Sequence, residues 1–259
     1  MAVLVDITKC IGCESCSVAC KHYNELDFKA KPRNVKNGVI DLDDNRWTVI
    51  QPYHTADDRL RFVKRQCLHC AEPACASACF SKAIQKDKET GAVVYYPQLC
   101  VGCRYCLVAC PYSLPRYQWN SAFPQVAKCQ MCESRLKQGD APACVSACPT
   151  GALIMGKREE LLEKAHEIIA KDKRYVQHVY GEHEVGGSEW LYISDVPFEE
   201  LGFKKVSDVP VTSYTQSYLH KVPGLALGWT IFLMIMSVYK YRCDEMKKSK
   251  GDKHEHEEE

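Results

Sequence analysis

Several features that would indicate catalysis or nucleic-acid binding are missing from this 259-residue sequence. Residues 1–9 have no basic start, no long apolar core and no twin-arginine pair, so we expect no export signal in the chain itself. There is no Gly-rich dinucleotide fingerprint and no nucleophile–base pair beside the motifs described below. The net charge is only +1, which does not suggest a nucleic-acid partner. We therefore expect no catalytic residues.

Cysteine is the abundant residue, with 17 in the chain. Disulfide scaffolds of this density are typical of small secreted chains, and this chain is long and otherwise ordinary in composition. Cys243 stands alone near the C-terminus, where an unmodified thiol is expected and lipidation is the alternative. The other sixteen form four quartets: Cys10, Cys13, Cys16 and Cys20; Cys67, Cys70, Cys75 and Cys79; Cys100, Cys103, Cys106 and Cys110; Cys129, Cys132, Cys144 and Cys148.

The spacing of the first and third quartets indicates iron–sulfur chemistry. Both have two, two and three residues between the cysteines, and Pro111 follows the third quartet as in bacterial ferredoxins. Gly12 and Gly102 occupy matching positions, where glycine lets the backbone turn and direct its N–H groups towards sulfur. Three such thiolates suit three corners of a cubane, and the fourth usually binds another cubane. Four quartets therefore predict four [4Fe–4S] clusters.

Zinc is the competing metal, but structural zinc sites usually join two separated pairs of ligands. Here four cysteines fall within eleven residues, twice. Spacing alone leaves the pairing of the quartets open. One pairing combines the outer two and the inner two, and the other combines the first with the second and the third with the fourth.

The rest of the sequence predicts a few regular elements. Strands are expected at 2–7, 92–96 and 190–194, and an amphipathic helix at 158–171. Residues 47–52 and 60–64 predict a hairpin within about 45–65. His69 is expected to hydrogen-bond the backbone, with ligation or proton transfer as alternatives. Phe80 occupies a position where proline is common.

An uncharged run of 18 residues, 222–239, predicts a membrane helix of about 27 Å, while a buried soluble helix is the alternative. Basic residues are more numerous after it than before it, which predicts a cytoplasmic C-terminus and a cysteine domain on the periplasmic side of the cytoplasmic membrane. The predicted domains are a four-cluster domain at 1–200, a linker at 201–221, a transmembrane helix at 222–240 and a charged cytoplasmic tail at 241–259. The tail is expected to be disordered from Lys250.

The segments 10–20, 67–75, 99–111 and 141–152 together resemble the iron–sulfur subunits of the molybdopterin oxidoreductase family. The likeness is strongest to the beta subunits of membrane-bound formate dehydrogenases, which also have a Trp-Thr-Val strand, here 47–49, one membrane helix and an acidic, His-containing tail. The resemblance implies an α+β fold with two bacterial-ferredoxin-like bis-[4Fe–4S] modules related by pseudo-two-fold symmetry. It also implies the nested ligand sets Cys10, Cys13, Cys16 and Cys148; Cys129, Cys132, Cys144 and Cys20; Cys67, Cys70, Cys75 and Cys110; Cys100, Cys103, Cys106 and Cys79.

The resemblance further implies a catalytic partner with molybdenum or tungsten bis-pterin, a cytochrome b partner that passes electrons to quinone, and export together with the catalytic partner. An electron-transfer subunit of formate dehydrogenase is therefore expected. The alternatives are the same role in a nickel–iron hydrogenase or in a polysulfide, nitrate or sulfoxide reductase, and, in another class, a zinc-stapled interaction module tethered to the membrane.

Overall fold

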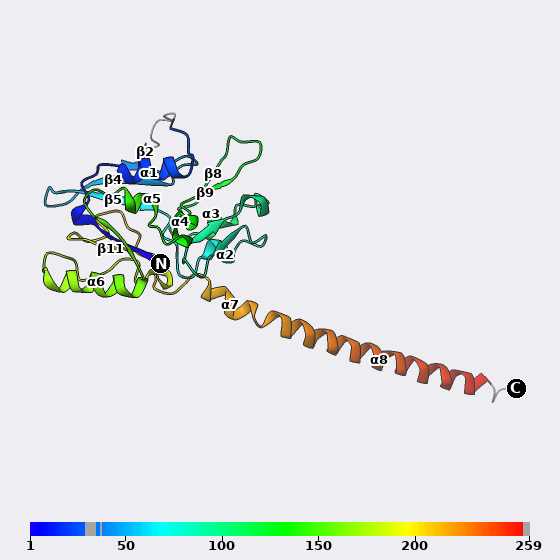
Figure 1. Cartoon of the computed structure of the whole chain (residues 1–259). Helices are drawn as coiled ribbons and strands as arrows, with labels where there is room; N and C mark the ends of the chain where they lie inside the picture. The colour runs from blue at the N-terminus through cyan, green and yellow to red at the C-terminus, as the bar shows by residue number, and fades with distance from the viewer. Residues whose placement is uncertain (29–34, 37, 256–259) are drawn as a thin grey trace. The chain divides into compact units, whose positions relative to one another are not determined.

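The computed structural model describes residues 1–28, 35–36 and 38–255 and divides into two units, Met1–Thr212 and a unit that begins at Ser213 (Figure 1). The helices of the first unit are α1 Ser15–Tyr23, α2 Ala74–Ser77, α3 Tyr105–Ala109, α4 Glu133–Lys137, α5 Ala143–Ser146 and α6 Arg158–Lys171, with short 3-10 helices η1 Ile7–Lys9, η2 Pro97–Leu99 and η3 Glu184–Gly186. Its strands are β1 Ala2–Asp6, β2 Val35–Lys36, β3 Val39–Ile40, β4 Thr48–His54, β5 Leu60–Gln66, β6 Ile84–Lys86, β7 Val93–Tyr95, β8 Arg116–Tyr117, β9 Val126–Ala127, β10 Leu153–Gly156 and β11 Trp190–Ile193. The result is a mixed α and β fold.

A three-stranded sheet in the order β10-β1-β11 connects the two ends of the first unit. β1 is antiparallel to β10 and parallel to β11. Because side chains alternate along a strand, β1 contributes to two separate cores. Ala2 and Leu4 pack with the buried face of α6, whereas Val3 and Val5 belong to the core that contains cysteine side chains. The helix predicted at 158–171 is confirmed as α6.

The remaining strands form antiparallel pairs: β2–β3, β4–β5, β6–β7 and β8–β9. β4 and β5 pair from Thr48↔Gln66 to His54↔Leu60, in the segment where the sequence predicts a hairpin. α1 packs against β4, so this hairpin lies beside the first cysteine loop (Figure 1).

The first unit extends past the boundary predicted at residue 200. Leu201 is buried, and the ring of Phe203 lies 4.6 Å from that of Tyr180 and 5.0 Å from that of Tyr192. The backbone N–H of Val185 donates to the carbonyl of Ser207 at 2.8 Å. Residues 201–212 therefore belong to the compact unit and not to a linker, because their apolar side chains complete its core.

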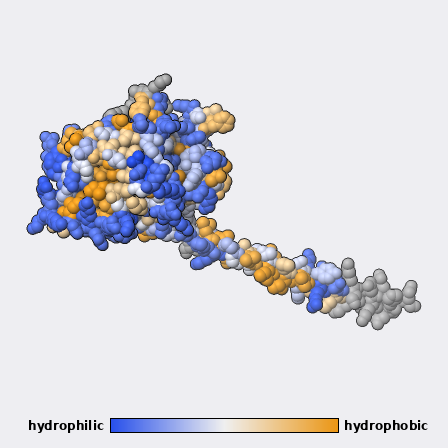
Figure 2. Space-filling model, viewed as in Figure 1, coloured by the Kyte–Doolittle hydropathy of each residue, from blue (hydrophilic) through white to orange (hydrophobic). Residues whose placement is uncertain are grey.

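The second unit consists of α7 Ser213–Leu219 and α8 Val222–Glu255. Within α8, the segment Val222–Met246 has 25 residues, and an 18-residue stretch of it has a mean hydropathy of 1.7 and is fully exposed. Among the described residues it is the one helix long and apolar enough to cross a membrane (Figure 2).

α8 is longer than the predicted span of 222–240. Residues 240–250 contain no proline or glycine, so nothing in them interrupts the helix. The expectation of disorder from Lys250 is wrong as far as Glu255, and 256–259 lie outside the described residues.

Candidate metal centres

The first and third quartets occupy loops with the same backbone path. In each, a strand leads into a 3-10 helix whose C-cap is the first cysteine, Cys10 or Cys100. The residue after the second cysteine, Glu14 or Arg104, adopts the left-handed conformation and caps the helix that carries the third cysteine. The internal repeat seen in the sequence is therefore also a repeat of structure.

Gly12 and Gly102 are required at the tightest point of these loops. Both have a positive φ, 74° and 72°. A Cβ on Gly12 would lie 2.6 Å from the ring of Phe62, and one on Gly102 would lie 3.0 Å from the Tyr117 hydroxyl. The Gly102 N–H also points at the Cys100 Sγ, with an N–S distance of 3.5 Å. The predicted role of these glycines in bringing N–H groups towards sulfur agrees with this geometry.

The second and fourth quartets share a different loop. A Pro-Ala-Cys sequence begins a short helix in each, with Pro73 and Pro142 as N-caps of α2 and α5. The last cysteine follows that helix and lies near a hydroxyl group: Cys79 Sγ is 3.6 Å from Ser81 Oγ, and Cys148 Sγ is 3.7 Å from Thr150 Oγ1.

These hydrogen bonds determine the pKa of the last cysteines. Burial alone would raise the pKa of Cys79 and Cys148. The hydroxyl and several backbone N–H groups outweigh it, and the net pKa of both thiols is lowered. A lower pKa favours the thiolate, the form that binds iron.

Packing joins the first loop to the fourth and the second to the third. β1 pairs with β10 and α1 packs on α5, which bring the ends of the chain together. β6 pairs with β7 and α2 packs on α3, which join the inner loops.

The sulfur atoms gather accordingly. Cys10, Cys13, Cys16 and Cys148 line one cavity whose other walls include the apolar Val5, Ile50 and Leu153. Burial raises the pKa of Cys16 to about 11, and charge on Cys144, Cys10 and Cys13 adds to the increase. Burial likewise raises the pKa of Cys10, whose nearest charged sulfur neighbours are Cys148 and Cys13.

Three further groups of cysteines are indicated by the charges that act on Cys20, Cys70 and Cys106. Burial raises the pKa of Cys20 to about 12, and Cys144 and Cys132 raise it further. Burial also raises the pKa of Cys70, with Cys67, Cys110 and Cys75 as added causes. For Cys106, burial raises the pKa to about 11, and the sulfur neighbours are Cys100, Cys103 and Cys79.

The arrangement of the cysteines distinguishes between the two candidate metals, zinc and iron. In the part of the chain that the structure describes, no three Cys, His, Asp or Glu side chains converge closely enough to hold one ion. All seventeen cysteines are free thiols. Zinc needs its ligands around a single point, whereas a cubane takes one thiolate at each of four separated irons. Thiols spread around an apolar cavity fit the cubane.

His69 lies between two ligand candidates and is completely buried. Its Nδ1 accepts a hydrogen bond from the Val93 N–H at 2.8 Å, which confirms the prediction that it bonds the backbone. Phe80 is exposed, and Cys243 lies in α8.

Two buried lysines were not predicted as functional residues. Lys64 and Lys128 are 3% and 2% exposed and lie among the cysteines. The Lys128 ammonium donates to the carbonyls of Val93 and Cys129. The sequence signal for such a buried lysine is its position beside apolar residues, as in Phe62-Val63-Lys64. That signal is weak, because a lysine near the end of a strand is usually exposed.

The sequence is similar to those of known iron–sulfur proteins. Residues 59–158 match the family described as a 4Fe-4S dicluster domain. The chain is 46% identical over 243 residues to a protein of Nitratidesulfovibrio vulgaris, covering 89% of this chain but only 64% of that relative. It is 30% identical over 290 residues to the hydrogenase-2 operon protein HybA of Escherichia coli, covering 98% of this chain and 88% of HybA. It is 36% identical over 200 residues to the nitrate-inducible formate dehydrogenase iron–sulfur subunit of Escherichia coli, covering 74% and 67%.

The likeness spans all four quartets, and the match to HybA extends through nearly the whole chain. Four [4Fe–4S] clusters are the cofactors of this chain, in keeping with its ferredoxin-like cysteine spacing. The chain belongs to the family of four-cluster ferredoxin-type iron–sulfur subunits that includes HybA and the iron–sulfur subunits of formate dehydrogenases.

Proposed function

We propose that this protein relays electrons through four [4Fe–4S] clusters in a membrane-bound oxidoreductase complex and catalyses no reaction alone. The proposed sets are named A to D: A is Cys10, Cys13, Cys16 and Cys148; B is Cys20, Cys129, Cys132 and Cys144; C is Cys67, Cys70, Cys75 and Cys110; D is Cys79, Cys100, Cys103 and Cys106. The observation that carries the proposal is the packing of the first loop with the fourth and of the second with the third, together with the cavity that Cys148 shares with Cys10, Cys13 and Cys16.

The electrostatic neighbours between sets support a linear order. Cys16 of A interacts with Cys144 of B, and Cys129 of B interacts with Cys67 of C. Cys75 of C interacts with Cys106 of D. Sets A and D therefore end the series, and each includes an exposed cysteine, Cys13 or Cys103. Electrons would enter at one end and leave at the other.

The two pairs of loops are built from the same elements, which supports two bis-cluster modules, A with B and C with D. Each module joins a strand–3-10–helix loop to a helix–strand loop through one antiparallel strand pair. We propose that pseudo-two-fold symmetry relates them. Bound clusters would supply one-electron carriers, and the chain's part is to hold them close, exclude water and set the charge around them.

For the catalytic partner we propose a molybdenum or tungsten bis-pterin subunit that oxidises formate, with a cytochrome b or other quinone-reactive subunit in the membrane. The similarity to a formate dehydrogenase iron–sulfur subunit supports this. The apolar segment of α8 supports anchoring in a bilayer. The excess of basic residues after it supports a cytoplasmic C-terminus and a periplasmic cluster domain.

A hydrogenase is the second candidate, and one observation favours it. The match to HybA covers 98% of this chain, whereas the match to the formate dehydrogenase subunit covers 74%. The match to HybA therefore includes nearly all of the C-terminal part of this chain. In that case the partner would hold nickel and iron.

Anaerobic purification of the full chain from its native membrane tests the proposal. Iron and sulfide should each approach sixteen atoms per chain for four cubanes, with broad visible absorption that is lost on reduction. A large subunit with molybdenum or tungsten would support the formate reading, and one with nickel would support the hydrogenase. A colourless, zinc-loaded protein would contradict both.

A further inference from the structure

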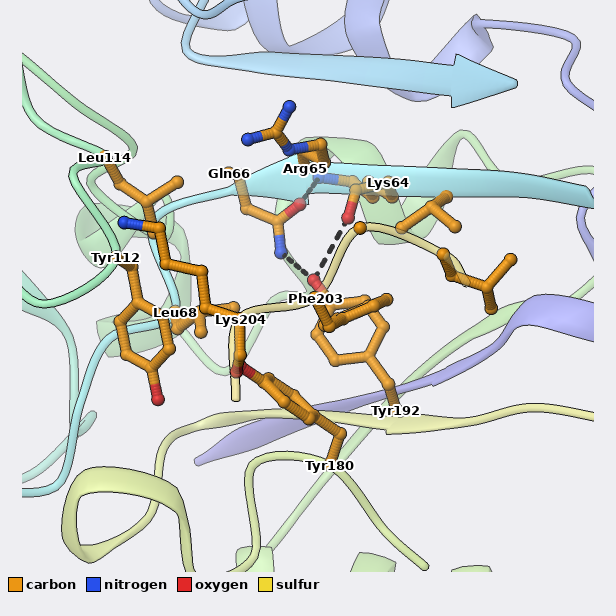
Figure 3. Close-up of a pocket in the computed structure, with 13 residues that line it drawn as sticks. Lys64, Arg65, Gln66, Leu68, Tyr112, Leu114, Tyr180, Tyr192, Phe203 and Lys204 are labelled. Atoms are coloured by element: carbon orange, nitrogen blue, oxygen red, sulfur yellow. Dashed lines mark hydrogen bonds between the residues drawn. The ribbon is translucent and has the colours of Figure 1, made fainter. Parts of the chain in front are cut away.

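Lys64 lies on β5 with its ammonium group buried in the first unit. The Nζ donates to Thr48 Oγ1 at 2.7 Å and to Gln66 Oε1 at 3.1 Å, and it lies 4.6 Å from the ring centroid of Trp190. Gln66 is itself held, because its Nε2 donates to the Tyr192 hydroxyl at 2.6 Å. That hydroxyl donates in turn to the Lys64 carbonyl at 3.1 Å. The bonds that link Lys64, Gln66 and Tyr192 hold Gln66 in position to accept from the ammonium (Figure 3).

These partners are all neutral. Among the described residues no Asp or Glu forms an ion pair with Lys64, unlike the less buried Lys86, whose Nζ lies 2.8 Å from Glu189. A buried charge without a counter-charge is costly. The structure must therefore contain another source of negative charge near this ammonium.

The proposed cluster ligands lie beside it, and a cluster held by them would supply that negative charge. Lys64 lines the same cavity as Cys10, Cys13, Cys16 and Cys148. Its electrostatic neighbours also include Cys144 and Cys129 of set B. It interacts with thiols of both set A and set B.

We infer that Lys64 is a fixed internal cation of the A–B module, placed to raise the reduction potentials of clusters A and B above those they would have without it. This rests on the proposed ligand sets. Reduction adds one negative charge to a cluster, and a cation held in a poorly polarisable interior stabilises that charge more than solvent-screened charges do. Lys64 is thus a positioning residue for electron transfer, acting through its charge and not through ligation.

The test is a redox titration of the full chain, in its complex, followed by EPR. Lys64→Met removes the charge and keeps the side-chain length, and Lys64→Gln also keeps a hydrogen-bond donor for Thr48. Both should lower the equilibrium constant for one-electron reduction of two clusters at least tenfold, equal to 59 mV each. The other two clusters should change much less. Cys148→Ser and Cys144→Ser assign the signals of A and B.

Two controls separate charge from shape. Lys9 adjoins Cys10 but is half-exposed and pairs with Asp6 at 3.1 Å, so Lys9→Met should leave all four potentials nearly unchanged. Lys64→Arg retains the charge and should keep the potentials of A and B near those of the wild type.

The possible results of the titration differ in what they say about the charge of Lys64. Four clusters with unchanged potentials in Lys64→Met and Lys64→Gln overturn it, while leaving the proposed relay intact. Loss of clusters A and B in the neutral variants, with all four retained in Lys64→Arg, supports a need for the charge. Loss in all three variants shows that shape matters and overturns it. A wild-type chain with fewer than four clusters contradicts the proposed function instead.

Discussion

Gly12 is a residue whose replacement should affect one cluster site. In Gly12→Ala the new Cβ meets the Phe62 ring at 2.6 Å with φ at +74°. Left-handed backbone costs a non-Gly residue about 1–2 kcal/mol, and the overlap adds to it. We expect lower thermal stability and loss of iron from the site of Cys10. Gly139→Ala is the control, since Gly139 has a positive φ but open space around it. Equal iron loss in both variants would contradict this explanation.

Cys110 tests the exchange of ligands between quartets. We expect Cys110→Ser to disrupt the cluster held by Cys67, Cys70 and Cys75, because its electrostatic sulfur neighbour is Cys67. Cys103→Ser, in the same sequence run, should disturb the other cluster. EPR of the two variants distinguishes the signals. Loss of the same signal in both would overturn the proposed sets.

Asp195 gives a prediction about pH. Its carboxylate accepts from Arg61 Nε at 2.9 Å and Nη2 at 2.5 Å, and these hydrogen bonds lower its pKa. A lowered carboxylate pKa contributes stability above the unfolded-state pKa and loses it as pH falls through the folded-state pKa. Asp195→Asn should therefore reduce the free energy of unfolding by about 1.5–3 kcal/mol. The difference should stay constant from pH 8 to 5, in thermal unfolding measured at several pH values.

Cysteine spacing alone predicts residues for the metal sites, because a cubane constrains how far apart its ligands can be. It could not anticipate Lys64. A lysine in a strand is normally solvated, and only the placement of β5 between the loops buries it.

At the scale of elements, β1 separates two cores, and this separation can be measured. Leu161 of α6 packs on the Ala2 and Leu4 face. Leu161→Ala should cost about 2–5 kcal/mol of stability without changing the visible spectrum or potentials. Val5, on the other face, lines the cavity with Cys10 and Cys16. Val5→Ala should instead shift the potential of that cluster with a smaller loss of stability. Equal spectral changes in both variants would argue against two cores.

Periodicity predicted β1, β7, α6 and β11 to within a few residues, because each has one clearly apolar face or run. Periodicity could not predict which strands pair. β1 lies between β10 and β11, which are more than 140 residues further along the chain, and no local pattern encodes such a partner.

For the whole molecule, the compact unit ending at Thr212 predicts where the chain can be cut. A chain ending after Thr212 should remain soluble without detergent and keep four clusters. A chain ending after Glu200 lacks Leu201 and Phe203 and leaves the rings of Tyr180 and Tyr192 uncovered. It should unfold at lower temperature and lose iron. Iron content and thermal unfolding of the two chains test this, and equal behaviour would contradict the boundary.

The sequence boundary at 200 was placed too early because residues 201–212 have no periodic pattern. Their contribution is individual side chains, Leu201 and Phe203 above all, filling gaps in a core made elsewhere. The end of α8 differs from the prediction for another reason: the charged composition that predicts disorder also contains residues that favour helix.

Cys13 and Cys103 are exposed, whereas the other quartet cysteines are more enclosed. This difference predicts the order in which oxygen would damage the clusters in air. In the isolated subunit, dissolved oxidants would reach these two sulfurs first, so bleaching should start at both extremities and move inward. A partly oxidised sample would then keep its middle carriers and still fail to exchange electrons with anything outside. In air, electron transfer to outside acceptors should accordingly be lost before total iron falls.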